Sequence, residues 1–97
     1  MNYRFLSPAI RELTEAVEYY ESQIAGLGAD FLDELDASIS RILQFPEAWG
    51  VISRPFRHCS FRRFPYTVIY VATGTENVLI VSIFHQHREP LSWKQNL

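Results

Sequence analysis

Two histidines and an arginine stand close together near the end of the chain, in the segment His85-Gln86-His87-Arg88. An imidazole can give or take a proton near neutral pH, and an arginine can neutralise a phosphate as charge develops on it. His85, His87 and Arg88 could therefore support acid–base chemistry. The alternative, which we favour, is structural: His85 packs under the C-terminal tail and forms a hydrogen bond with the backbone there.

The same two histidines have the spacing of metal ligands on a strand, because alternate strand residues share a face. A zinc site needs three or four ligands, and the only other histidine or cysteine residues are His58 and Cys59. We therefore predict no metal site and no cofactor. No sequence signature marks Cys59 as a catalytic thiol. A single cysteine also excludes an internal disulfide, which indicates a reducing cytoplasm.

Three short apolar runs between Phe56 and Phe84 predict the strands that position these side chains. The second and third runs, Tyr66–Ala72 and Val78–Phe84, are rich in Val, Ile, Tyr and Phe. Phe64-Pro65 closes the first run and residues 73–77 close the second. We expect an antiparallel meander that ends at the histidine segment. Both faces of these strands are largely apolar, unlike those of a sheet with one wet side.

The first half of the chain predicts a short strand at Tyr3–Phe5 and then a helical hairpin. Ser7-Pro8 marks the start of the first helix. Its apolar stripe comprises Ile10, Leu13, Val17, Tyr20 and Ile24. Its acidic residues, Glu12, Glu15, Glu18 and Glu21, lie off the stripe and should face water.

Gly26-Leu27-Gly28 ends this first helix, and a second helix is expected from about Ala29 to Phe45. Pro46 stops the second helix. Its apolar stripe comprises Phe31, Leu32, Leu35, Ile39, Ile42 and Leu43. Residues 47–54 look irregular, with Trp49 as a tether to the core. The tail after Pro90 is too short to form a stable helix alone.

These elements predict one α+β domain spanning residues 1–97, in the order β-α-α-β-β-β. An N-terminal strand and a helical hairpin pack on an antiparallel sheet. The composition, 47 % hydrophobic and 21 % charged, is that of a globular protein. No apolar run approaches the ~20 residues of a membrane helix, and the N-terminus lacks a signal-peptide pattern. We therefore expect a cytoplasmic protein with no membrane partner.

Charge is unevenly distributed along the chain. Residues 1–47 contain three basic and nine acidic residues, a net charge of −6, whereas residues 48–97 contain six basic and two acidic residues, a net charge of +4. This asymmetry predicts an acidic helical side and a basic sheet side. A basic side can meet nucleic acid or an acidic protein segment. The alternative is a solvated charged face with no partner.

The order of elements, together with three local motifs, resembles the RelE/ParE superfamily of toxins from type II toxin–antitoxin systems. The resemblance spans nearly the whole chain. Its motifs are the hairpin turn at Gly26-Leu27-Gly28, then Arg62-Arg63-Phe64-Pro65-Tyr66 with Tyr70, then Phe84-His85-Gln86-His87-Arg88 leading through Pro90 to Trp93. It implies a bacterial toxin of the plasmid-stabilisation type, held inactive by direct binding of a cognate antitoxin.

The superfamily contains RelE-like nucleases, which cleave mRNA on the ribosome, and ParE-like inhibitors of DNA gyrase. RelE-like nucleases place an arginine after the tyrosine that opens the middle strand, where this chain has Thr67. They tend to place lysines on the preceding strand, where His58 and Ser60 stand. A further arginine lies near the end of their last strand, at the position of Gln86. Most of the cationic apparatus for RNA cleavage is therefore missing.

We therefore expect a ParE-like toxin that acts by binding gyrase and is not a nuclease. A RelE-like ribosome-dependent endoribonuclease using His85, His87 and Arg88 is the alternative, and a degenerate module that only binds antitoxin is the third interpretation. The expected patch for antitoxin or target is apolar and rimmed by arginines. Its residues are Arg57, Arg62, Arg63, Tyr66, Tyr70, Arg88 and Trp93.

Overall fold

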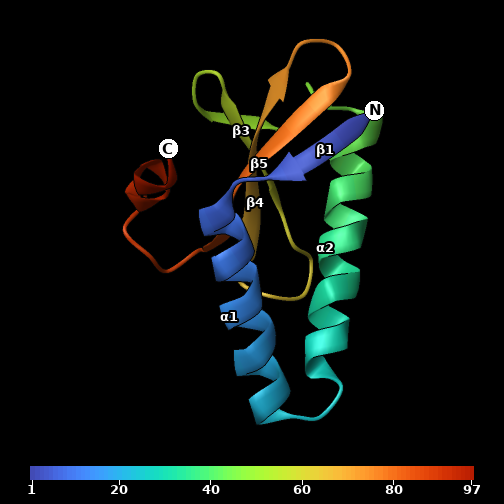
Figure 1. The fold of residues 1–97 in the computed structure, drawn as a ribbon, viewed down its shortest axis with the longest axis vertical. Helices are drawn as coiled ribbons and strands as arrows, with labels where there is room; N and C mark the ends of the chain where they lie inside the picture. The colour runs from blue at the N-terminus through green and yellow to red at the C-terminus, as the bar shows by residue number, and fades with distance from the viewer.

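The structure is a computed structural model that describes residues 1–97. Two helices pack on one face of a five-stranded sheet, and a short 3-10 helix lies at the C-terminal end of the chain (Figure 1). The elements are β1 (Asn2–Phe5), α1 (Ser7–Gln23), α2 (Leu27–Gln44), β2 (Gly50–Ser53), β3 (Phe56–Ser60), β4 (Tyr66–Thr73), β5 (Asn77–His85) and η1 (Ser92–Asn96). The α+β fold and the helical hairpin are confirmed.

The sheet has the strand order β1-β5-β4-β3-β2 and differs from the expectation in two respects. The meander β3-β4-β5 is antiparallel as predicted, but β1 pairs with β5 in parallel, so the sheet is mixed. Parallel strands need a long connection between them. The chain between β1 and β5 includes both helices, so it is long enough for this pairing. Part of the segment expected to be irregular forms the edge strand β2, which pairs with β3.

The face of α1 that meets the sheet differs from the predicted stripe. Ala9 and Ala16 are its buried residues, whereas Ile10 is 50 % exposed and Ile24 is 65 % exposed. Two alanines on one side let the helix approach the strands closely. The larger apolar residues of α1 are consequently turned toward α2, and the expectation that Ile10 and Ile24 are buried was wrong.

The turn between the helices depends on two glycines and one carboxylate. Gly26 adopts φ +94°, a left-handed conformation that favours glycine. A Cβ at Gly28 would lie 3.2 Å from the Val17 side chain, so glycine lets α2 start close against α1. The Glu21 carboxylate accepts hydrogen bonds from the Gly26 and Gly28 amides and caps the start of α2.

Apolar side chains form one cluster on each face of the sheet. The larger cluster lies under the helices and includes Phe31, Val68, Tyr70 and Ile80. The smaller cluster, on the opposite face, contains Ile69, Val81, Phe84 and Trp93. The tail forms η1 and inserts Trp93, which is 1 % exposed and packs edge-on against Phe56. The tail therefore covers part of the second apolar face.

Candidate functional site

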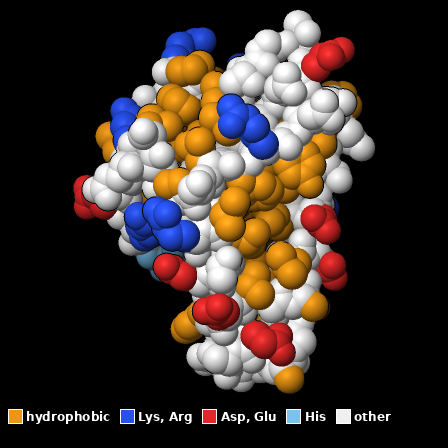
Figure 2. All heavy atoms as spheres, viewed as in Figure 1, with side chains coloured by type: hydrophobic (Ala, Val, Ile, Leu, Met, Phe, Trp, Pro, Cys, Tyr) orange, Lys and Arg blue, Asp and Glu red, His pale blue; other side chains and the backbone are white.

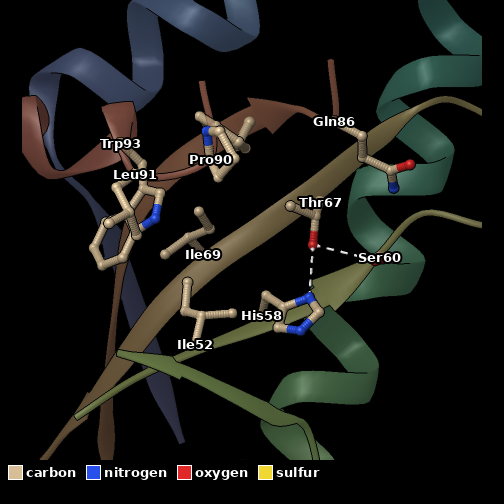
Figure 3. Close-up of a pocket in the computed structure, with 10 residues that line it drawn as sticks. Ile52, His58, Ser60, Thr67, Ile69, Gln86, Pro90, Leu91 and Trp93 are labelled. Carbon is tan, nitrogen blue, oxygen red and sulfur yellow. Dashed lines mark hydrogen bonds between the residues drawn. The ribbon is translucent and has the colours of Figure 1, made fainter. Parts of the chain in front are cut away.

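A pocket of about 500 Å³ lies between the C-terminal tail and the face of the sheet that the helices leave uncovered (Figure 3). We call it the tail-side pocket. Its apolar side is formed by Ile52, Ile69, Phe84, Pro90, Leu91 and Trp93. Its polar end is formed by His58, Ser60, Thr67 and Gln86. It combines an apolar wall with a few convergent polar groups, the usual character of a binding pocket.

Strand alternation brings the polar residues of this pocket together. His58 and Ser60 are alternate residues of β3, and Ser60 pairs directly with Thr67 on β4. The Ser60 hydroxyl donates to Thr67 Oγ1 at 3.3 Å, and Thr67 Oγ1 lies 3.5 Å from His58 Nδ1 (Figure 3). Gly50 allows β2 to pass beside the imidazole, because a Cβ there would be 3.0 Å from His58 Nε2.

The lining of the tail-side pocket carries no Lys, Arg, Asp or Glu side chain. Four polar residues of the pocket stand where the sequence comparison places cationic residues in RelE-like nucleases. These residues are His58, Ser60, Thr67 and Gln86. The sequence suggested these positions separately, on three strands, and the structure gathers them in one pocket. The pocket offers hydroxyl, amide and imidazole groups, so it can bind an uncharged group but has no fixed charge to stabilise a developing phosphorane.

His85 and Arg88 lie on the other side of the sheet from Gln86, beside α1. A pocket of about 150 Å³, the hairpin-side pocket, is lined by Glu12, Glu15, Ala16, Tyr66, Ile83, His85 and Arg88. The His85 ring packs edge-on against Tyr66, with the centroids 4.9 Å apart. Its Nδ1 accepts a hydrogen bond from the His87 amide at 3.1 Å. The expectation that His85 packs under the tail and bonds backbone there was wrong, because Phe84 takes the tail side and the backbone partner of His85 is the His87 amide.

Glu12 is the residue that the sequence interpretation misplaced most. Its side chain is 16 % exposed rather than facing water. Oε1 accepts hydrogen bonds from the Ser82 hydroxyl at 2.8 Å, the Ile83 amide at 3.2 Å and the Asn96 amide group at 3.1 Å. Oε2 pairs with the Arg88 guanidinium at 2.8 Å. This single carboxylate therefore joins α1, β5 and the tail.

Two titratable residues of the hairpin-side pocket, His85 and Tyr66, have shifted pKa values. Partial burial, and the neighbouring His87 and Arg88, lower the pKa of His85 below its ordinary value. Burial raises the pKa of Tyr66, with smaller contributions from nearby tyrosines and Glu12. Both shifts favour the neutral form, an uncharged imidazole at His85 and an uncharged phenol at Tyr66.

The predicted arginines do not rim one patch. Arg57 donates to the backbone carbonyl of Trp49 at 2.8 Å. Arg63 pairs with Asp30 of α2 at 3.4 Å, in the exposed loop between β3 and β4. Arg88 pairs with Glu12 at the end of β5. Arg62, in the same loop as Arg63, is exposed and forms no ion pair within the chain.

Two further predicted contact residues are buried in the free protein. Tyr70 is 0 % exposed, and its hydroxyl donates to the carbonyl of Pro46 at 2.7 Å. Trp93 fills the second cluster. Both side chains support the fold, and neither offers a surface to a partner while the tail is docked. Cys59 is also buried, and burial raises the pKa of its thiol, which makes it unreactive.

The structure was also compared with the requirements of a metal site and of a membrane-spanning helix. No three side chains among His, Cys, Asp and Glu are arranged to hold a metal ion. Neither helix is apolar enough over a sufficient length to cross a membrane. The two pockets described above are the cavities of this structure.

Similarity to known proteins agrees with the fold. The family model described as "ParE toxin of type II toxin-antitoxin system, parDE" matches residues 3–90. No curated protein is significantly similar in sequence. A solved structure described as a chromosomal ParDE toxin–antitoxin system from P. aeruginosa superimposes with a TM-score of 0.75 at 15 % identity, over 88 % of this chain and 95 % of the other. The chain therefore belongs to the ParE toxin family of type II toxin–antitoxin systems.

Proposed function

We propose that this chain is a toxin that acts by binding DNA gyrase rather than by cleaving RNA. The observation that carries the proposal is the uncharged lining of the tail-side pocket. RNA cleavage through the 2′-hydroxyl requires a base, an acid and cations placed where charge develops. His58, Ser60, Thr67 and Gln86 include one titratable group and no cation. Membership of the ParE family supports gyrase as the target.

One observation favours a nuclease as a second candidate: Tyr66, His85 and Arg88 line the same hairpin-side pocket. Two features weaken it. The positive charge of Arg88 is already neutralised by Glu12 at 2.8 Å, and Glu15 adds a second negative charge to the pocket. A phosphate in this pocket would lie near two carboxylates. The lowered pKa of His85 also reduces the fraction of its imidazole that carries the extra proton a leaving oxygen needs.

The two candidates are separated by primer extension on mRNA after the chain is induced in bacteria without an antitoxin. A binding toxin leaves transcripts intact and raises the DNA-damage response with filamentation. His85→Ala and His87→Ala should remain toxic, with stable folded protein confirmed for each. Codon-linked cleavage that disappears in either variant would support the nuclease. A folded chain that arrests no growth would support a module that only binds antitoxin.

We further propose that a cognate antitoxin neutralises the toxin by covering the tail-side pocket. An apolar anchor from the antitoxin suits the wall formed by Ile69, Phe84 and Leu91, since Leu91 is 54 % exposed. Ser60, at the polar end, lies two residues before Arg62 in the chain. An acidic residue beside the anchor can therefore pair with the free Arg62 guanidinium.

Hydrogen exchange on the free protein and on the complex with the product of an adjacent antitoxin gene tests this placement. We expect added protection at β3, the start of β4 and the tail. Arg62→Ala should weaken the complex and lower its salt dependence, whereas Arg54→Ala, another exposed arginine, serves as the control. Protection confined to the outer surface of the helices would contradict the placement.

A further inference from the structure

An exposed apolar stripe runs along the helical hairpin on the side away from the sheet (Figure 2). We call it the hairpin stripe. It consists of Ile10, Leu13 and Val17 from α1 and Leu32 and Leu43 from α2. Ile10 is 50 % exposed and Leu32 is 42 % exposed, while the other three are partly buried beside the main core. None of these residues lines the tail-side pocket.

Helix geometry explains why these residues form one surface. Each residue of a helix turns by about 100°, so the larger apolar side chains of α1 are rotated away from Ala9 and Ala16, which face the sheet. This rotation carries them toward α2, where a Cβ at Gly28 would touch Val17. Leu32 lies one helical turn after Gly28, and Leu43 lies three turns after Leu32, so both lie near the side of α2 that carries Gly28. Two half-buried rows therefore meet along the hairpin.

Acidic side chains border the stripe. Glu21 lies one turn after Val17, and Asp36 lies one turn after Leu32. Glu18 and Asp33 point outward beside them, and Figure 2 shows acidic groups at the lower end and along the right edge of the stripe. The chain contains two salt bridges, Arg63–Asp30 and Arg88–Glu12. Glu18, Asp33 and Asp36 are thus left without a cationic partner.

We propose that the hairpin stripe binds a basic amphipathic helix of a partner protein. Apolar residues of that helix would lie on the stripe, and its Lys or Arg side chains would pair with the unpartnered carboxylates. A two-fold contact with a second copy of this chain would instead bring two acidic borders together, which opposes association. Leu32 and Leu43 are eleven residues apart, or about 16 Å along α2, so three helical turns of the partner suffice.

The test uses two synthetic 16-residue peptides that share one leucine face and carry either lysine or glutamate beside it. Binding to the 15N-labelled protein is followed by NMR, and affinities are measured at low and high salt. The lysine peptide should bind at least ~10-fold more tightly at low salt, with the difference shrinking as salt screens the charges. Shifts should map to α1 and α2.

Variants at two sites on the stripe and its border make the test specific. Ile10→Ser with Leu32→Ser should weaken binding of the lysine peptide at least ~10-fold, because it removes apolar contact area. Val51→Ser is the matched control, since Val51 is also 42 % exposed but lies on β2. Asp33→Asn with Asp36→Asn should reduce the preference for lysine over glutamate.

Three outcomes would overturn the proposal. The first is equal affinity for both peptides, or binding of neither. The second is a set of chemical shift changes confined to the sheet. The third is a dimer, seen by analytical ultracentrifugation, that becomes monomeric in the Ile10→Ser, Leu32→Ser variant, because that result would assign the stripe to a second copy of the chain.

Discussion

Replacing Glu12 with alanine should destabilise the protein more than any other single change at a charged residue. The substitution removes the acceptor for the Ser82 hydroxyl and the Ile83 amide, which lie on the part of β5 that β1 does not reach. Ser82 is 0 % exposed and Ile83 is 1 % exposed, so water cannot readily replace the carboxylate. The Asn96 side chain also loses one of its two acceptors and with it part of its hold on the tail.

The magnitude follows from these contacts. Each buried donor left without an acceptor costs ~1–3 kcal/mol. The Arg88 pair contributes less, under ~1 kcal/mol, because Arg88 is 41 % exposed and its charge is screened. With two buried donors affected, Glu12→Ala should lower the free energy of unfolding by about 2–6 kcal/mol. With an m-value of ~1 kcal/mol per M, the urea midpoint should fall by at least ~2 M.

Urea unfolding followed by circular dichroism measures this change, with Glu12→Gln as the matched variant. The glutamine oxygen can still accept from the Ser82 hydroxyl and the Ile83 amide, so we expect a loss within ~1 kcal/mol. Hydrogen exchange at the Ile83 amide should accelerate in the alanine variant. If the alanine variant is as stable as the wild type, or if glutamine costs as much as alanine, the role assigned to Glu12 is incorrect.

Three other substitutions give distinct expectations. Trp93→Ala should cost about 3–5 kcal/mol of stability because Trp93 fills the second core, whereas Leu97→Ala, at a 63 % exposed residue, should cost little; equal thermal shifts would argue that the tail is not docked. Tyr70→Phe should lower the free energy of unfolding by about 1 kcal/mol, because it removes the hydroxyl that donates to the Pro46 carbonyl. An unchanged urea midpoint would show that this hydrogen bond is unimportant. The lowered pKa of His85 means that the unfolded chain binds more protons than the folded chain, so wild-type stability should fall as the pH drops through 6.5 and below. His85→Gln should flatten this dependence of stability on pH. An unchanged pH profile in the variant would contradict the lowered pKa.

The central strands and the helices could be predicted because their signals are local. Tyr66–Ala72 and Val78–Phe84 were expected, and β4 and β5 extend them by one or two residues. The second helix was expected from Ala29 to Phe45 and runs from Leu27 to Gln44. Strand propensity and helical periodicity are sufficient for such elements. The edge strand β2 has only four residues and a weak pattern, so its pairing with β3 decides its structure.

The features that depend on distant contacts were not accessible from the sequence. Glu12 looked like a solvent-facing helix residue, because its partner Asn96 is 84 positions away. Trp93 was expected to anchor a partner, and its burial against Phe56 depends on how the tail folds back. The sequence of a helix does not show which of its polar residues will lie against a strand segment that has no neighbouring strand. The sequence identifies Glu12 and Trp93 as notable residues, but only the three-dimensional structure shows what surrounds them.

The residues of the tail-side pocket could be identified from the sequence, but their arrangement could not. His58, Ser60, Thr67 and Gln86 were each identified by the resemblance to nuclease toxins. Their convergence in one pocket follows from the register of β3 with β4 and of β4 with β5. That register depends on pairing between strands rather than on any local pattern. The chemical conclusion that the pocket lacks fixed charge therefore required the structure.

The most direct test of the central proposal is a gyrase supercoiling assay with the purified toxin and a parallel assay for mRNA cleavage in a translating extract. Binding without chemistry predicts that the toxin inhibits supercoiling in proportion to its concentration, that its antitoxin reverses the inhibition, and that mRNA on the ribosome stays intact. Full supercoiling activity in the presence of excess toxin, together with ribosome-dependent mRNA cleavage, would contradict it.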